Sequence, residues 1–535
     1  DFATTNLAAT DQVSDSPTNN WCVLNSVSLT STATLSDGNL TLSNTSTGST
    51  TGTLATPSSG KWYFEVKFDS QSAAVTSQSV GVVKAEEAYI TGTTGGGIYF
   101  FTTGLLRVEG DDSAGSSWGS AWGVGETIGV AIDLDANKIW FAIDNTWQAS
   151  GDPSAGTDPA ASGFSSEPYV ALIRNGNASR TTGWTANFGQ NAFAYTPPTD
   201  FLALNSANLP DPAIADPSAY FQTTLYEGDG STQSIDQDGN STFSPNFVWI
   251  KNRDATDAHA LFDTVRGATE VLSSNSVAAE ATNADTLTAF ESDGFALGDD
   301  VIVNTNAESY VAWQWNEGAT PGFDIVSYSG TGANRTVAHN LGVKPGMFIV
   351  KQRGAADTNW GVYHSGIGAT KSLFLHSTGA AVDSAEYFND TEPTSSVFTL
   401  GTNAQGNADG GTYIAYVFAP VEGFSAFGSY LGNANANGPM VNLGFRPNLL
   451  IVKESSSTDD WVIYDSARDP INVAGRVLRS DSTAAEFDGR GGSRDVDFLS
   501  NGFKFRSSNA TMNGSGVTYV YMAWAESPFK TANGR

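Results

Sequence analysis

Three lysines, each closing an apolar segment, are the residues of this sequence that most invite a chemical role. The segments FVWIK, MFIVK and LLIVK end at Lys251, Lys351 and Lys453. Such a segment looks at first like a motif with a reactive lysine. Two plainer roles compete with reactivity. We favour the first, in which the methylene stem carries the charge out to solvent. In the second, the amine forms an ion pair with Asp263, Asp465 or another nearby acid.

The histidines give little support for catalysis. All four precede residue 377, so the copy of the segment at Lys453 has no histidine near it, and Asp465 stands there in the register of His364. A catalytic group is seldom exchanged in this way among copies of one frame. We therefore favour a solvated or core-edge role for the histidines, which are His259, His339, His364 and His376.

Sequence motifs of known catalytic sites are missing from the chain. It contains no G-x-S-x-G elbow, no P-loop and no H-E-x-x-H zinc motif. Its 56 acidic residues are so frequent that no carboxylate pair stands out for glycoside hydrolysis. We predict that the protein is not an enzyme and uses no cofactor.

Two acidic loops imitate the beginning of a calcium-binding loop. Asp133, Asp135 and Asn137 have the alternate spacing of such ligands, and so do Asp236 and Asp238. The first loop lacks the glycine at its sixth position and the glutamate at its twelfth, and the second gives no continuous ligand series. We predict that both are hairpin turns, and we assign no metal ligand.

Three tryptophans in Gly/Ser/Asn-rich stretches are the candidate ligand-binding residues. Trp118, Trp122 and Trp147 could stack on a sugar ring if their faces were exposed. Packing in the core competes with this role and is the better expectation for any one of them. The loops 111–124 and 147–168 are the first places to search for a receptor site, because connecting loops carry the binding residues of most β-sandwiches.

Composition restricts the partners that this chain can have. It has 535 residues and a formal net charge of −30, which opposes binding to nucleic acid. No apolar run approaches the length that spans a bilayer, so we expect no membrane insertion. The single cysteine, Cys22, excludes a disulfide framework within the chain. Only 15% of the residues are charged, so that the polar surface must come largely from Ser, Thr, Asn and Gly, as in turn-rich β folds.

The first 200 residues read as an antiparallel sandwich. In KWYFEVKFD, Trp62, Phe64, Val66 and Phe68 alternate with polar or amphipathic residues, which is the period of a strand with one buried face. GETIGVAIDLDANKIWFAIDN predicts two strands, 127–134 and 138–144, that are joined by a tight turn.

This region resembles the SPRY (B30.2-like) family over residues 55–195. The order of KWYFEVKF, SVGVV, GIYFF, GETIGVAIDLDANKIWFAIDN and YVALIRNG carries the resemblance. Gly125, Ile128, Gly129 and Asp133 fit the hairpin pattern of that family, whereas Asp144-Asn145-Thr146 replaces its usual Asn-Gly turn. The resemblance implies a β-sandwich that serves as a binding module, with its partner set by variable loops.

A threefold repeat follows a stretch that is rich in proline. Pro245, Pro345 and Pro447 are spaced by 100 and 102 residues, and each lies six positions before one of the three lysines. Corresponding tyrosines lie upstream in LYEGDG, SYSGTG and SYLGNA, and each copy closes with an aromatic segment, YVAWQW, YIAYVF or YVYMAW. Duplication explains this pattern best. Asp293-Gly294 and Asn501-Gly502 predict hairpins, and convincing helical periodicity is absent apart from a short turn in SNSVAAEAT.

The sequence thus predicts an all-β chain, a SPRY-like β-sandwich followed by three tandem β-sandwich-like repeat domains. The predicted parts are an N-terminal segment that joins the sandwich (1–54), the SPRY-like sandwich (55–196), a Pro-rich linker that docks on a neighbour (197–218), and three β-repeats (219–320, 321–421 and 422–535).

Most of the chain resembles predicted tail or fibre proteins of marine bacteriophages. TNLAATDQVSDSPTNNWCVLN and the F-x-W-I-K-N-R repeat segments carry this resemblance. It implies a virion protein on the extracellular particle, a tail fibre or other host-attachment protein that contacts other virion proteins and a host cell-surface glycan or protein. A homo-oligomer, a trimer as in many fibres, is implied by analogy alone. Two alternatives stay open: a capsid decoration or tail-shaft assembly protein, and a secreted bacterial adhesin or polysaccharide-binding protein.

Overall fold

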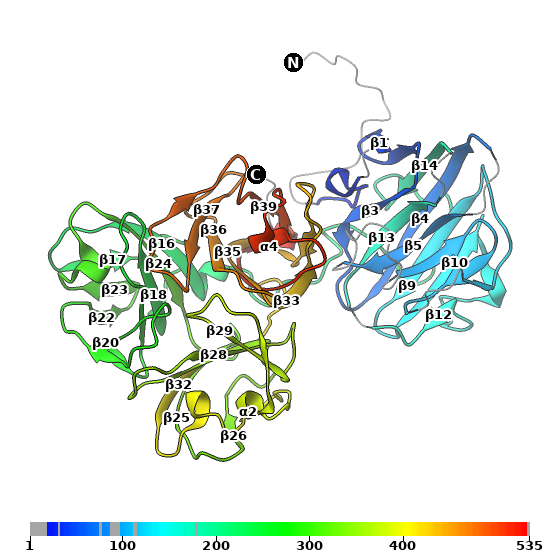
Figure 1. Cartoon of the computed structure of the whole chain (residues 1–535). Coiled ribbons are helices and arrows are strands. Elements are labelled where there is room, and N and C mark those ends of the chain that lie inside the picture. The colour runs from blue at the N-terminus through cyan, green and yellow to red at the C-terminus, as the bar shows by residue number, and fades with distance from the viewer. Residues whose placement is uncertain are drawn as a thin grey trace, which may run out of the picture. The chain divides into compact units, whose positions relative to one another are not determined.

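The computed structural model of the chain divides into two compact units, unit 1 up to Asp211 and unit 2 from Pro212 (Figure 1). It describes residues 19–29, 33–73, 77–85, 97–110, 115–165, 167–176 and 180–531. Most of the N-terminal segment TNLAATDQVSDSPTNNWCVLN and the start of the loop 111–124 lie outside the described residues. Nearly all regular structure is β, so the expected fold class is confirmed. No described helix has the length and apolar character needed to cross a membrane.

Unit 1 consists of two antiparallel sheets that pack face to face. The first contains, in spatial order, β1 (Ala33–Ser36), β2 (Thr41–Asn44), β14 (Thr182–Asn187), β4 (Lys61–Gln71), β9 (Thr127–Asp133), β10 (Lys138–Ile143) and β11 (Thr146–Trp147), with β12 (Ala161–Ser162) and β15 (Leu202–Ala203) attached to β10 and β4. The second contains β3 (Gly48–Ala55), β13 (Tyr169–Asn175), β5 (Gln78–Lys84), β6 (Gly97–Phe101), β7 (Leu105–Arg107) and β8 (Ser116–Ser117). Short 3-10 turns lie at Ser26–Ser28 and Gln148–Ser150. Phe100 of β6 meets Phe141 of β10 across the sandwich, with ring centroids 5.6 Å apart.

Strand β4 is buried on more than the one face that its alternation predicts. Tyr63 and Glu65 are buried as well as the apolar set. The reason is that the chain returns over this face after β14: the Glu65 carboxylate accepts hydrogen bonds from the backbone N–H groups of Ala194 and Tyr195, at 2.8 and 3.0 Å. The ring of Phe193 lies 5.0 Å from that of Tyr63.

The Pro-rich stretch 197–218 is divided between the two units. Its first part packs on unit 1, where Phe201 and Leu204 are buried and β15 pairs with β4 in parallel. Ile214 is buried in the core of unit 2, just before a 3-10 turn at Pro217–Ala219. The segment therefore docks through its apolar side chains, with few residues left to act as a free connector.

Unit 2 contains three six-stranded antiparallel sheets of identical order (Figure 1). Repeat 1 has β16 (Phe221–Glu227), β24 (Ser309–Trp315), β18 (Phe247–Asn252), β19 (Ala260–Asp263), β20 (Gly267–Leu272) and β21 (Ala281–Thr282). Repeat 2 has β25 (Phe323–Ser329), β32 (Thr412–Phe418), β27 (Met347–Gln352), β28 (Trp360–His364), β29 (Lys371–Phe374) and β30 (Val382–Asp383). Repeat 3 has β33 (Ser425–Leu431), β41 (Thr518–Pro528), β35 (Phe445–Glu454), β36 (Trp461–Asp465), β37 (Arg476–Arg479) and β38 (Phe487–Asp488). A last 3-10 turn lies at Phe529–Thr531.

The three repeats share one core instead of standing in a row. In β18, Phe247 and Trp249 belong to a central cluster to which all three repeats contribute. The alternate side chains Val248 and Ile250 belong to an outer cluster of repeat 1 alone. Because successive side chains of a strand point to opposite faces, the apolar segment contributes to the central and to an outer cluster in repeats 1 and 2. In repeat 3 the side chains of both faces belong to the central cluster.

Each outer core is covered by a small sheet and a one-turn helix. The small sheets are β17 (Gln233–Asp236), β23 (Gly294–Leu297) and β22 (Leu287–Glu291) in repeat 1, β26 (Arg335–Ala338) and β31 (Val397–Leu400) in repeat 2, and β34 (Met440–Asn442), β40 (Gly502–Phe505) and β39 (Val496–Leu499) in repeat 3. The helices are α1 (Val301–Asn304), α3 (Ala404–Asn407) and α4 (Ala510–Asn513), each begun by an Asp or Asn cap; a further turn, α2 (Ala385–Phe388), occurs in repeat 2. The corresponding tyrosines Tyr226, Tyr328 and Tyr430 each donate a hydrogen bond of 2.7 Å to a carbonyl oxygen of these capped helices.

The glycines of the two predicted hairpins are needed for close approach. Gly294 and Gly502 begin the returning strands β23 and β40 after the turns at 292–293 and 500–501. A Cβ on Gly294 would lie 2.0 Å from the carbonyl oxygen of Ile235. On Gly502 it would lie 1.9 Å from that of Val441, so no other residue fits either position.

Candidate functional site

The three lysines of the repeated segment are buried, and both expectations for them are wrong. Lys251, Lys351 and Lys453 each have 0% of their surface exposed. The amine of Lys351 donates to the carbonyl oxygen of Thr358 at 2.6 Å, to its hydroxyl at 2.8 Å and to the carbonyl oxygen of Val277 at 3.2 Å. The ammonium group therefore donates its hydrogen bonds to protein oxygens, chiefly backbone carbonyls, and neither reaches solvent nor pairs with a carboxylate.

The same arrangement recurs at the other two lysines. Lys251 donates to the carbonyl oxygen of Asn252 at 2.6 Å, and Lys453 to those of Glu454 and Thr378 at 2.7 and 3.1 Å. Burial lowers the pKa of each lysine to about 8. Val277 and Thr378 belong to the repeat before the lysine, so the amines of Lys351 and Lys453 connect neighbouring repeats.

A second set of repeated positions closes the three repeats into a ring. Trp360 donates its indole N–H to the carbonyl oxygen of Ser273 in repeat 1, and Trp461 donates to that of Phe374 in repeat 2, both at 3.0 Å. At the same position of repeat 1, His259 Nε2 lies 2.9 Å from the carbonyl oxygen of Arg479 in repeat 3. The last repeat thus bonds to the first as the others bond to each other.

Histidine His259 is a neutral part of this ring. Its Nδ1 accepts a hydrogen bond of 2.8 Å from the indole of Trp249, so Nε2 carries the proton and donates to the carbonyl oxygen of Arg479. Burial, with a contribution from the charge of Lys251, lowers the pKa of His259 to about 3. The ring nitrogens are both engaged, and neither is free to transfer a proton.

We call the contacts between successive repeats joint 1–2, joint 2–3 and joint 3–1. In joint 1–2, Glu280 lies between two guanidinium groups: Arg353 donates to it at 2.8 Å and Arg266 at 3.2 Å. Arg266 also pairs with the buried carboxylate of Asp263, which accepts a hydrogen bond of 2.7 Å from the hydroxyl of Tyr416 in repeat 2.

Joint 3–1 has the same network, formed by the equivalent Asp, Glu and Arg residues of repeats 3 and 1. Glu486 accepts from Arg253 at 2.9 Å and from Arg468 at 3.1 Å. Arg468 pairs with Asp465 at 2.6 Å, and Asp465 accepts from the indole of Trp313 in repeat 1 at 3.1 Å. Every charge in the two networks has an opposite charge within hydrogen-bond distance, which is the condition under which buried ions are tolerated.

Joint 2–3 has none of these charges. His364, Ile367 and Ala381 replace the Asp, Arg and Glu of the other joints, and Ser455 replaces the second Arg. His364 Nδ1 accepts from the N–H of Gly366 at 3.0 Å, and its Nε2 lies 3.0 Å from the carbonyl oxygen of Tyr521 in repeat 3. Burial lowers the pKa of His364 to about 4. A cavity of about 300 Å³ lies beside Ile367, Ala381 and Ser455.

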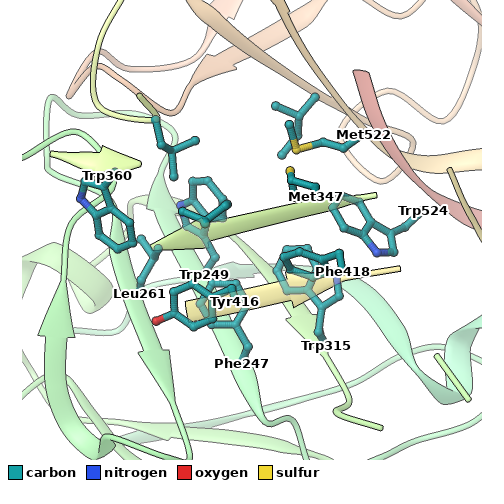
Figure 2. Close-up of a pocket in the computed structure, with 13 residues that line it drawn as sticks. Phe247, Trp249, Leu261, Trp315, Met347, Trp360, Tyr416, Phe418, Met522 and Trp524 are labelled. Atoms are coloured by element: carbon teal, nitrogen blue, oxygen red, sulfur yellow. The ribbon is translucent and has the colours of Figure 1, made fainter. Parts of the chain in front are cut away.

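The centre of unit 2 is a packed core and not a binding site. Figure 2 shows large side chains from all three repeats converging there, among them Trp249, Met347 and Trp524. The remaining space is about 20 Å³, too little for a ligand larger than water. The lining side chains are those of Phe247, Trp249, Leu261, Trp315, Met347, Ile349, Trp360, Leu375, Tyr416, Phe418, Ile451, Met522 and Trp524.

The three candidate tryptophans of unit 1 lie in different environments. Trp122 is buried in the sandwich core, 6.1 Å from Phe68 and 6.2 Å from Trp184 between ring centroids, so it packs and offers no open face to a sugar. Trp118 and Trp147 are half-buried, at the edges of Phe100 and Tyr63. A ligand role stays a prediction for these two.

A cavity of about 480 Å³ opens among the loops of unit 1. It is lined by residues 108–110 after β7 and 161–165 at and after β12, together with Ile98 of β6. Glu109 at its wall pairs with Lys84 at 2.5 Å and accepts a hydrogen bond of 3.1 Å from the hydroxyl of Tyr169. Residues 161–165 belong to the loop 147–168 in which the sequence directs a search for a receptor site, although none of the three tryptophans lines the cavity.

The acidic loop at Asp133 is a turn between β9 and β10. The Asp133 carboxylate accepts hydrogen bonds of 3.0 Å from the N–H groups of Asp135 and Ala136, and it lies 3.3 Å from the amine of Lys61. Asp236 ends β17. Within the described ranges, no group of three His, Cys, Asp or Glu residues is placed to hold a metal ion.

Comparison with solved structures finds similarity to SPRY domains over about a third of the chain. The SPRY domain of human HERC1 is 12% identical with a TM-score of 0.23, and the match covers 32% of this chain and 96% of that one. A human SPRY domain is 17% identical with a TM-score of 0.23, covering 30% and 97%. The TRIM65 PSpry domain is 13% identical with a TM-score of 0.23, covering 31% and 91%. No curated protein matches the chain.

A protein-family model matches the region that forms unit 2. The match runs over residues 216–528, from just before β16 to the end of β41, and therefore takes in all three repeats. It spans more than half of the 535 residues. The chain belongs to the family described as the domain of unknown function DUF7483.

Proposed function

We propose that this chain is a non-enzymatic virion protein of a bacteriophage that attaches the particle to its host, with unit 2 as a rigid hub and the loops of unit 1 as the binding part. The observation that carries the proposal is the cavity of about 480 Å³ among the loops of unit 1. Its volume is within the range of small-ligand sites, and polar groups such as Glu109 and Ser165 line it next to the apolar Ile98 and Phe164.

The side chains of unit 2 that could do chemistry support a structural role for the hub. Lys351 and Lys453 are bonded to carbonyl oxygens of the preceding repeat, and Asp263 and Asp465 are bonded to arginines and to the following repeat. Groups held in this way contribute to the geometry of the ring, and an acid, base or nucleophile needs an open side toward a substrate.

The proposed partners follow from the attachment role. They are other virion proteins and a glycan or protein of the host surface, met outside the cell; the net charge of −30 speaks against nucleic acid. A homotrimer is part of the proposal by analogy with fibres. Unit 2 already closes its ring within one chain, so a trimer would use other surfaces, and light scattering of the full-length protein measures the number of chains.

Two measurements test the proposal. Mass spectrometry and immunogold labelling of purified phage particles should find the chain on the particle exterior. Labelled full-length protein should bind host cells and compete with particle adsorption, and Ser162→Trp, which places an indole at the cavity wall, should abolish that binding. Ser117→Trp, an equally exposed position on β8 that does not line the cavity, is the matched control.

The outcomes separate the alternatives. A chain that is on the particle but binds no host cell would identify an assembly or decoration protein, and the attachment role would be wrong. A chain absent from particles but secreted and bound to polysaccharide would identify the adhesin alternative. Turnover of a host polysaccharide would overturn the non-enzymatic role.

A further inference from the structure

The cavity at joint 2–3 occupies the place where the other two joints hold their ion pairs. Its volume is about 300 Å³. Ile367 and Ala381 stand where Arg266 and Glu280 stand in joint 1–2, and Ser455 stands where Arg353 does. The residues that line it are Gly366, Ile367, Lys371 and Ala381 of repeat 2 and Ser455, Ser456 and Thr518 of repeat 3.

Side-chain replacement, and not an opened backbone, creates this cavity. The N–H of Ala381 donates to the carbonyl oxygen of Ser455 at 2.9 Å. The equivalent bonds are Glu280 to Arg353 at 2.9 Å and Glu486 to Arg253 at 2.8 Å. An equivalent backbone hydrogen bond of nearly equal length is therefore present in all three joints, and the cavity of joint 2–3 lies where the other two joints hold guanidinium and carboxylate groups.

The lining of the cavity combines one cation, several hydroxyls and an apolar wall. Lys371 is exposed, and the residue opposite it on β30 is Asp383. Among the described residues, no carboxylate lies within ion-pair distance of its amine. Its counterpart in repeat 3, Arg476, lies 3.6 Å from a carboxylate oxygen of Asp469. Ser456 and Thr518 present hydroxyl groups that can donate and accept hydrogen bonds, and Ile367 supplies apolar contact.

We propose that the cavity of joint 2–3 binds a small sugar acid, a ring with several hydroxyls and one carboxylate. The carboxylate pairs with Lys371, the hydroxyls bond to Ser456 and Thr518, and the ring lies against Ile367. A volume of about 300 Å³ is at the lower end of the range for small-ligand sites and suits a single sugar unit. The proposal goes beyond the attachment role and does not depend on it, because it concerns unit 2 and a free ligand in solution.

Titration of the full-length protein with glucuronate or galacturonate, followed by ligand-observed NMR, tests the proposal. The wild-type chain should bind either acid saturably, and at least about tenfold more tightly than it binds glucose, since only the acids carry a charge for Lys371. Lys371→Gln should weaken the binding of the acids about tenfold. Lys67→Gln, an exposed lysine of unit 1, is the matched control and should leave it unchanged.

A second variant fills the cavity. Ala381→Glu together with Ser455→Arg rebuilds the pair that Glu280 and Arg353 form in joint 1–2, and it should abolish binding of the acids while the melting temperature shows that the chain is folded. Absence of binding to the wild-type chain at millimolar sugar acid would overturn the proposal, and so would equal binding by Lys371→Gln. Because host-cell binding is tested at Ser162 in unit 1, failure of either proposal is recognised separately.

Discussion

Joints 1–2 and 3–1 are closed by buried charge, whereas joint 2–3 is closed by small and apolar side chains on the same backbone. Where the first two place Asp, Arg and Glu, the third has His364, Ile367 and Ala381. All three joints have a hydrogen bond from a ring N–H to a backbone carbonyl oxygen. The donors are Trp360, Trp461 and His259, and the distances are nearly equal. Backbone contacts are thus common to the three joints, and the charged residues are absent from joint 2–3 as a set.

The reason lies in the cost of an incomplete network. A buried ion whose partner is removed keeps its desolvation penalty, whereas exchange of the whole set for apolar residues of similar size is often nearly neutral. Glu486 accepts hydrogen bonds from two arginines, Arg253 and Arg468. Loss of either arginine would leave the two acids of joint 3–1, Glu486 and Asp465, with only one of these cations. Joint 2–3 has lost its acids and arginines together, and His364 there is neutral because burial lowers its pKa to about 4.

The largest difference between the joints should appear when one position is changed to methionine in both. Arg468→Met leaves Asp465 without its guanidinium partner in joint 3–1 and should reduce the free energy of unfolding by about 3–5 kcal/mol. Ile367→Met introduces methionine at the equivalent position of joint 2–3. It should reduce the free energy of unfolding by less than about 1.5 kcal/mol. Calorimetric unfolding of the two full-length variants at pH 7 measures both.

Equal losses in the two variants would contradict the comparison, because the charge network would then add nothing to the packing of the position. Arg506→Met, on an exposed arginine of repeat 3 whose guanidinium lies 3.5 Å from Asp497, is a control for loss of a surface arginine and should change the free energy of unfolding by less than about 1 kcal/mol.

Acid should weaken joint 2–3 through His364. Burial lowers the pKa of His364 to about 4 in the folded chain, whereas an unperturbed histidine has a pKa of about 6.5. The folded state therefore binds fewer protons between these pH values, so its stability is complete above pH 6.5 and is lost as the pH falls toward 4. The loss is about 3 kcal/mol, at about 1.4 kcal/mol for each unit of pKa difference.

The variant His364→Asn should remove this part of the pH dependence. Its unfolding free energy should fall less steeply than that of the wild-type chain between pH 6.5 and 4.5, as followed by chemical denaturation. An unchanged slope in His364→Asn would mean that this histidine is protonated in the folded chain.

Much of the local structure could be predicted from the sequence. The predicted strands 127–134 and 138–144 correspond to β9 (Thr127–Asp133) and β10 (Lys138–Ile143), and both predicted Gly hairpins occur. These features depend on alternation and turn residues that lie next to each other in the chain. The one-turn helices such as α1 are four residues long, too short to give a periodic signal, although Asp300 already marks the cap.

The ring and its joints could not be predicted by the same means. His259 contacts Arg479 across 220 positions of sequence, and Val277, one of the two residues whose carbonyl oxygens accept from Lys351, lies in another repeat. No local pattern predicts either contact. One signal was present: in the aligned copies, Asp263 and Arg266 change together to His364 and Ile367. A set of charges that is lost as a unit indicates that its members touch.

The smallest difference should appear at the lysines, which joints 1–2 and 2–3 share. Lys351→Met leaves the carbonyl oxygens of Val277 and Thr358 without their hydrogen-bond donor, and Lys453→Met does the same to those of Thr378 and Glu454. Each substitution should therefore lower the free energy of unfolding by about 2 kcal/mol at pH 7. Burial lowers both lysine pKa values to about 8, so the folded wild-type chain releases these protons before the unfolded chain does. Wild-type stability therefore gains from these groups between pH 8 and about 10.4, and the deficit of each variant should widen over that interval. Denaturation at pH 7 and pH 10 measures the deficits, and unequal losses at the two lysines would show that the carbonyl contacts are not the part that the joints have in common.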